Sequence, residues 1–211
     1  MINIRYIIMA GTNYNPTGVT FEMPRQLAEI KGEALIERTI RLLREQGVTD
    51  IAISSENPIF EQFGVPVLKH NNTPDSWLNA FYPMDEPVCY LYGDVCYSPN
   101  AIRIIVETQT DDIEFFASAP PFAENYIKNH AEPLGYKVVN TEHFKQAIAE
   151  TKDLFRKGIL KREISWELWQ VIKKTPLNTI IYTNYTAIND YSVDIDTPRE
   201  LMKIEKYVED R

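Results

Sequence analysis

The chain has 211 residues, and its 44% hydrophobic and 25% charged residues are ordinary for a globular domain, which excludes collagen-like, low-complexity and disordered classes. With 30 acidic and 22 basic residues, the formal net charge is -8. This balance argues against nucleic acid as a partner, because non-specific binding to a phosphate backbone depends on basic residues.

Two cysteines, Cys89 and Cys96, have a spacing that fits neither a zinc site nor a redox pair, so we expect buried thiols in a reducing compartment. The first residues lack the pattern of a signal peptide, and no uncharged run is long enough to cross a bilayer. The sequence therefore predicts a cytoplasmic protein with no membrane partner.

The apolar run at residues 6–11 predicts a buried strand that ends at Ala10 and Gly11. A long polar loop follows, beginning with Thr12 and Asn13 and reaching Pro24-Arg25. A loop at the carboxyl end of a central strand lies where open α/β sheets bind ligands, and Gly11 permits close approach of the backbone. An ordinary strand-to-helix connection accounts for the same residues equally well.

The rest of the chain alternates between helical and extended patterns. In chain order we predict a helix at 33–46 with Gly47 as its cap, strand 51–54, helix 59–63, strand 65–68, helix 76–82, strand 87–92, a helix from 98 through 106, strand 113–118, strand 135–139, a helix from 141, helix 166–172, strand 176–182 and a terminal helix from Pro198 capped by Thr197. This alternation predicts a mainly parallel sheet in one α/β domain, residues 1–211.

Two acidic positions follow predicted strands or precede a helix. Asp94 comes after Gly93 and the apolar strand 87–92, and a charge in that place requires a reason. Asp196 precedes Thr197-Pro198, with Asp194 as a neighbour that could take its place. The alternatives are a turn residue for Asp94 and a helix-entry acid favoured by the helix dipole for Asp196.

The order of these features resembles the nucleotidyltransferases of the sugar-phosphate and MobA-like type, which have the three-layer GT-A, Rossmann-like fold. The resemblance covers nearly the whole chain in outline, from 7–11 through 30–40 to 196–201, and is weakest between about 120 and 174. It implies a nucleotide-binding half at about 1–110 and an acceptor-binding half at 111–211. It also implies a monomer or homodimer.

Such enzymes join a nucleoside triphosphate to a phosphorylated acceptor and release pyrophosphate, with Mg²⁺ and positioning supplying most of the rate. The resemblance implies catalytic roles for Asp94, Asp196 and Arg25, with the two aspartates as metal ligands. Arg25 stands in the position of the family's phosphate-binding lysine, although a solvated cation explains it almost as well. The product would be a nucleoside-diphosphate-linked sugar or alcohol, of a kind that feeds surface polysaccharide.

Further site residues follow from the same resemblance. Nucleotide contacts fall at Ala10, Gly11, Thr12, Asn13, Asn71, Asn72, Ser76 and Gly93, and acceptor contacts at Glu132, Tyr136 and Trp166. Asparagine can read the edge of a base, but turn formation explains Asn71 and Asn72 equally well. The aromatic residues of the second half are more typical of core than of a ligand site.

One stretch departs from the family pattern. Between Gly11 and Pro24 the loop is longer than usual, and it lacks both a second glycine soon after the first and a basic residue before Arg25. This departure supports an alternative, namely a catalytically degenerate protein that binds a nucleotide or sugar phosphate and has a regulatory role.

Overall fold

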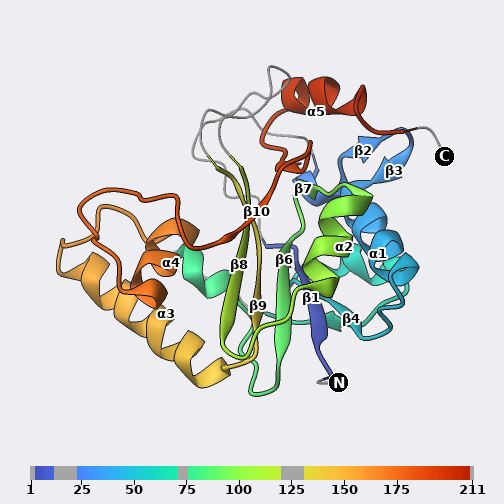
Figure 1. The fold of residues 1–211 in the computed structure, drawn as a ribbon. Helices are drawn as coiled ribbons and strands as arrows, with labels where there is room; N and C mark the ends of the chain where they lie inside the picture. The colour runs from blue at the N-terminus through green and yellow to red at the C-terminus, as the bar shows by residue number, and fades with distance from the viewer. Residues whose placement is uncertain (1–2, 12–22, 71–75, 120–130, 210–211) are drawn as a thin grey trace.

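A seven-stranded sheet forms the centre of the computed structural model, which describes residues 3–11, 23–70, 76–119 and 131–209 (Figure 1). The strand order is β10-β8-β9-β6-β1-β4-β5. The bounds are Arg5–Met9 for β1, Ile51–Ser54 for β4, Val67–Leu68 for β5, Val88–Tyr92 for β6, Ile113–Ser118 for β8, Pro133–Val138 for β9 and Thr186–Ile188 for β10. Neighbouring strands are parallel except at β9, which is antiparallel to β6 and β8. The predicted mainly parallel sheet is confirmed.

Helices cover both faces of this sheet. On one face lie α1 (Leu35–Glu45) and α2 (Pro99–Glu107), and on the other lie α3 (Thr141–Arg156) and α4 (Ser165–Lys173) (Figure 1). The helices pack on strands that are buried along nearly their whole length, and the main core is formed between these layers. The three-layer α/β architecture is therefore also confirmed.

A smaller unit lies at the edge of the sheet where β1 and β6 end. It contains the hairpin of β2 (Glu29–Ile30) and β3 (Glu33–Ala34), the antiparallel pair of β7 (Val95–Cys96) and β11 (Val193–Asp194), and α5 (Pro198–Glu205). These elements share a second apolar core made of Ala28, Ile30, Leu35, Cys96, Val193, Ile195, Ile204 and Val208. The last segment of the chain is thereby packed against segments that follow β1 and β6.

Several local predictions are confirmed. Gly47 follows α1 with a positive φ of 78°, as a helix-ending glycine requires. Thr197 caps α5, and its side chain accepts a hydrogen bond from the backbone of Glu200. Cys89 and Cys96 are both buried and unbridged. Among the described residues, no helix combines the length and apolar character needed to cross a membrane.

Other local predictions are wrong. No strand forms at 176–182, because Gln170 on α4 binds the carbonyl oxygens of Pro176 and Thr179 and holds this segment against the helix end. The strand comes later, as β10. The helix predicted from Glu33 starts at Leu35, since Glu33–Ala34 pairs in the hairpin. The helix predicted at 76–82 is only a short 3-10 helix, η3 (Trp77–Ala80), whereas the short helix predicted at 59–63 is present as the 3-10 helix η2 (Pro58–Phe63).

Candidate active site

Asp94 reaches the edge of the sheet because Gly93 allows two strand ends to lie very close together. Tyr92 pairs with Met9 at the ends of β6 and β1, and the amide of Gly93 donates a hydrogen bond of 3.0 Å to the Met9 oxygen. A Cβ at Gly93 would lie only 2.6 Å from that oxygen. Glycine is therefore required here, and the chain places Asp94 directly beyond the carboxyl ends of the two central strands.

The β7–β11 pair brings Asp196 to the same place. Val95 is paired with Asp194, and one step further along the chain the amide of Ile195 donates to the carbonyl oxygen of Asp94 at 2.9 Å. Asp196 is the next residue. Two acids that are distant in the sequence are thus connected through backbone hydrogen bonds.

The start of α5 fixes the backbone of Asp196. The Glu200 carboxylate accepts hydrogen bonds from the amides of Asp196 at 2.7 Å and Thr197 at 3.0 Å, and the amide of Glu200 donates to the Thr197 hydroxyl at 3.3 Å. This reciprocal arrangement is a capping box. It holds the amide of Asp196 at the start of the helix, while the Asp196 side chain turns to Arg25.

Arg25 bridges the two aspartates. It begins the 3-10 helix η1 (Arg25–Leu27), and its guanidinium lies 2.9 Å from the Asp94 carboxylate and forms a second, shorter contact with Asp196. Burial alone lowers the pKa of Arg25, but the carboxylates of Asp94, Asp196 and Asp194 together raise it above its ordinary value. The carboxylates therefore create a negative potential at the site, which stabilises the positive charge of the Arg25 guanidinium.

The donor set fits Mg²⁺. Asp94 and Asp196 supply hard carboxylate oxygens, and the side chains retain exposed fractions of 18% and 43% through which a ligand can reach them. Mg²⁺ commonly uses one or two carboxylates and completes its octahedron with water and substrate phosphates. Within the described ranges no group of three or more potential metal-binding side chains occurs, so any ion here would depend on such further ligands.

Several solved structures that align with the chain are named as nucleotidyltransferases. The chain aligns with a putative glucose-1-phosphate thymidylyltransferase from Bacillus anthracis at a TM-score of 0.60 and 18% identity, covering 97% of this chain and 95% of that one. The CTP:phosphocholine cytidylyltransferase from Streptococcus pneumoniae aligns at 0.53 and 14%, covering 99% and 100%. The chain has the nucleotidyltransferase fold. HddC from Yersinia pseudotuberculosis in complex with GMP-PN also aligns, at 0.55 and 14%, covering 97% and 99%.

At these identities the similarity is one of fold. No protein-family model and no curated protein sequence matches the chain. The resemblance proposed from the sequence is thus confirmed as a shared nucleotidyltransferase fold over nearly the whole chain. The assignment of individual site residues depends instead on the contacts among Arg25, Asp94 and Asp196.

The predicted nucleotide-binding residues are only partly described. Thr12, Asn13, Asn71 and Asn72 lie outside the described residues. Ala10 is buried, and its amide donates a hydrogen bond of 3.0 Å to the carbonyl oxygen of Ser54. Gly11 follows Ala10 at the same edge of the sheet as Gly93. Ser76 precedes η3, and its buried hydroxyl has no hydrogen-bond partner within the described ranges. A hydroxyl without an internal partner can bind a ligand without first breaking a hydrogen bond within the protein.

The predicted acceptor-binding residues lie together but are packed into the fold. The indole N–H of Trp166 donates a hydrogen bond of 2.9 Å to the carbonyl oxygen of Ala131, the residue before Glu132. The hydroxyl of Tyr136 donates a hydrogen bond of 2.6 Å to the carbonyl oxygen of Ser165. Their exposed fractions are 7% for Glu132, 0% for Tyr136 and 3% for Trp166. Tyr136 stacks on Phe115 in the core, as we expect for most aromatic residues of this half.

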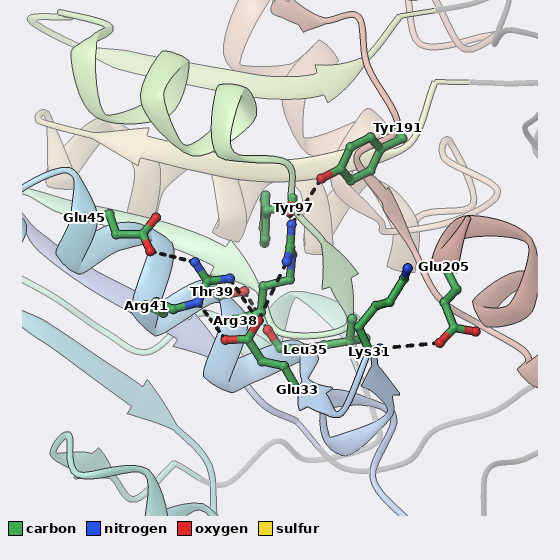
Figure 2. Close-up of polar contacts among 10 residues, drawn as sticks. All are labelled: Lys31, Glu33, Leu35, Arg38, Thr39, Arg41, Glu45, Tyr97, Tyr191 and Glu205. Atoms are coloured by element: carbon green, nitrogen blue, oxygen red, sulfur yellow. Dashed lines mark hydrogen bonds and ion pairs between the residues drawn. The ribbon is translucent and has the colours of Figure 1, made fainter. Parts of the chain in front are cut away.

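The sequence did not predict an ionic network centred on Glu33 and Arg38, whose side chains are buried (Figure 2). Arg38 on α1 donates to the Tyr97 oxygen and the Tyr191 hydroxyl, each at 3.1 Å, and lies 3.7 Å from Glu33. Arg41 binds the same Glu33 carboxylate through two bonds of 2.8 and 2.9 Å. In the sequence these charges are indistinguishable from the solvated face of an amphipathic helix. In the structure they join α1 to the segments that follow β7 and precede β11.

Proposed function

We propose that the chain is a magnesium-dependent nucleotidyltransferase, which joins a nucleoside triphosphate to a phosphorylated acceptor and releases pyrophosphate. The observation that carries the proposal is the convergence of Arg25, Asp94 and Asp196 at the carboxyl ends of β1 and β6. Ligand sites of open α/β sheets lie at this edge, and the fold over nearly the whole chain is that of nucleotidyltransferases.

The residues of the site match the requirements of this reaction. An oxygen of the acceptor phosphate attacks the α-phosphorus, and the bond from that phosphorus to the bridging oxygen breaks, so the electron pair leaves with pyrophosphate. Mg²⁺ held by Asp94 and Asp196 would neutralise phosphate charge. Arg25, released from the aspartates, would bind phosphate oxygens, for which its planar fork is well suited.

The proposed substrate contacts are distributed over the two halves of the chain. In the nucleotide half they are the backbone at Ala10, Gly11 and Gly93 together with the side chain of Ser76, and Thr12, Asn13, Asn71 and Asn72 complete the set. In the acceptor half they are Glu132, Tyr136 and Trp166, which are buried, so contact with an acceptor would require the packing around them to open. For the acceptor we propose a sugar phosphate or a small alcohol phosphate, because the aligned proteins carry names that include glucose 1-phosphate and phosphocholine. Cytoplasmic synthesis of a surface polysaccharide precursor is the corresponding role.

The test has two stages. Thermal shift with CTP, UTP, GTP, ATP and dTTP in the presence of Mg²⁺ identifies the nucleotide, since a ligand that binds the folded state raises the melting temperature. Pyrophosphate release is then measured with glucose 1-phosphate and phosphocholine. Asp94→Asn should reduce release by about a hundredfold or more, because loss of a metal ligand removes several kcal/mol of charge stabilisation.

The matched control is Asp50→Asn. Asp50 is also a partly exposed aspartate paired with an arginine, Arg5, but it lies at the opposite edge of the sheet, where β4 begins. This variant should keep full turnover. Unchanged pyrophosphate release in Asp94→Asn would show that the assignment of the site is wrong.

A second candidate function is binding without turnover, in a regulatory protein. It is favoured by Arg25, which stands where the family has lysine and occupies both carboxylates at once. In that case the thermal shift persists with a nucleotide, while no acceptor gives pyrophosphate. The two stages of the experiment therefore separate the two functions.

A further inference from the structure

A cavity of about 390 Å³ lies on the face of the sheet that is covered by α3, away from Asp94. Its walls come from η3 and the residues that follow it, from β6 and from α3. One end reaches Val138, which is paired with Val88 at the start of β6, whereas Asp94 follows the end of that strand. The cavity is thus separate from the candidate active site, and its volume is in the range of small-molecule pockets.

The floor of the cavity is aromatic. The ring of Phe81 contacts the rings of Tyr90 and Phe144 at centroid distances of 5.2 and 5.1 Å, and Tyr90 stacks on Phe144 at 5.8 Å. All three side chains are at most 6% exposed, so their positions are set by the core. The hydroxyl of Tyr90 is bound to the Tyr82 oxygen at 2.5 Å. The floor therefore offers fixed ring surfaces to an apolar or aromatic group.

The rim of the cavity is cationic. Lys145 and Lys152 are seven residues apart on α3, so they lie two turns apart on the same side of the helix with Ile148 between them. Lys145 is bound by the exposed carboxylates of Asp85 and Glu142. Among the described lining residues there is no carboxylate. Because Asp85 and Glu142 compensate the charge of Lys145, the remaining positive charge of the rim is that of Lys152.

Lys152 is the residue whose charge is available to a ligand. Its ammonium donates 2.5 Å to the side-chain oxygen of Asn79, a neutral partner, and no ion pair to it occurs in the described part of the chain. Burial lowers its pKa, and Glu163 and Arg156 act on that pKa in opposite directions. A half-buried ammonium with a neutral partner gains from an anion, because the interaction is only partly screened by water.

From the aromatic floor, the cationic rim and the neutral partner of Lys152, we propose that this cavity is a second ligand site, which binds a small aromatic acid with its ring on Phe81 and Phe144 and its anionic group at Lys152. This site is independent of the proposed nucleotidyl transfer, and it requires no metal. It also lies next to η3, which follows the predicted nucleotide-contacting segment.

The experiment uses a matched pair of probes, naphthalene-2-carboxylate and its neutral analogue naphthalene-2-carboxamide, with binding measured by titration calorimetry on the full chain. The wild type should bind the carboxylate at least about tenfold more tightly than the carboxamide. In Lys152→Met, which keeps the length of the side chain, the two probes should bind equally, with the affinity for the carboxamide unchanged. Ile148→Trp, which fills the space between the lysines, should abolish binding of both.

The matched control is Lys157→Met, in which an exposed lysine near the end of the same helix, bound to Asp153, is removed. This variant should retain the preference for the carboxylate. Circular dichroism and melting temperature verify that each variant is folded. Equal affinities of the two probes for the wild type, failure of both to bind, or an unchanged preference in folded Lys152→Met would overturn the proposal.

Discussion

Two ionic clusters of this fold use arginine in opposite ways. In the site cluster, Arg25 holds Asp94 and Asp196 through side chains that are 24%, 18% and 43% exposed. In the buried cluster, Arg38 and Glu33 are only 7% and 2% exposed, and every group of the arginine has a fixed partner. The first cluster opens to solvent at Asp196, whereas in the second cluster solvent reaches Arg41, which is 34% exposed, but not Arg38 or Glu33.

The difference in burial indicates a difference in role. A buried ion pair is expensive to break, because the remaining partners stay without water, whereas a partly exposed pair contributes little to stability. The buried cluster therefore joins α1 to the segments around the site. On the proposed function, the contacts of the site cluster would be exchanged for a metal and phosphates at small cost. The following variants test this contrast.

The largest effect on stability is expected for Arg38→Met. The change removes donors from the Tyr97 oxygen and the Tyr191 hydroxyl, and it takes one arginine away from the Glu33 carboxylate, which keeps its contact with Arg41. We expect a loss of roughly 3 kcal/mol in the free energy of unfolding, measured by urea denaturation. Arg103→Met is the control, because Arg103 and Glu107 form an exposed pair on α2 whose loss should cost less than about 0.5 kcal/mol. Similar losses in both variants would contradict the structural role of Arg38.

A smaller effect, on metal affinity, is expected for Arg25→Met. Without Arg25 the carboxylates of Asp94 and Asp196 lose a shared cationic partner, so a divalent cation should bind more tightly in the absence of nucleotide. We expect an increase of about tenfold or more in affinity for Mn²⁺, a substitute for Mg²⁺ that can be followed by electron paramagnetic resonance. Stability should change by less than about 1 kcal/mol, since the pair is partly exposed.

Arg5→Met is the matched control for this measurement. Arg5 binds Asp50 at 2.9 Å and this pair is also partly exposed, at 41% and 33%, but it lies at the other end of β1. Its removal should leave the affinity for Mn²⁺ unchanged. An unchanged affinity in Arg25→Met would mean that Arg25 does not compete with the metal for the two aspartates.

The contrast also explains what could be predicted from the sequence. Asp94 was identifiable because a charge directly after a buried strand is rare, and Asp196 because Thr197-Pro198 marks the start of a helix. The role of Arg38 could not be predicted, because the pattern of an amphipathic helix does not indicate which of its charged side chains are buried. The β7–β11 pair could not be predicted either, because a strand of two residues is too short to show an alternating pattern. The missing strand at 176–182 depends on Gln170, a contact that only the folded helix α4 provides.

The smallest effect is expected at the helix that holds Asp196. Thr197→Ala removes the hydroxyl that accepts the Glu200 amide, and loss of such a cap typically costs about 1 kcal/mol. Hydrogen exchange should increase in α5 while the central strands stay protected, because α5 packs in the second apolar core and the central strands form the main one. Thr197→Ser, which keeps the hydroxyl, should behave as the wild type. If exchange instead increased across the main sheet, α5 would belong to the same cooperative unit as the buried cluster, and the separation between an exchangeable site and a fixed support would not hold.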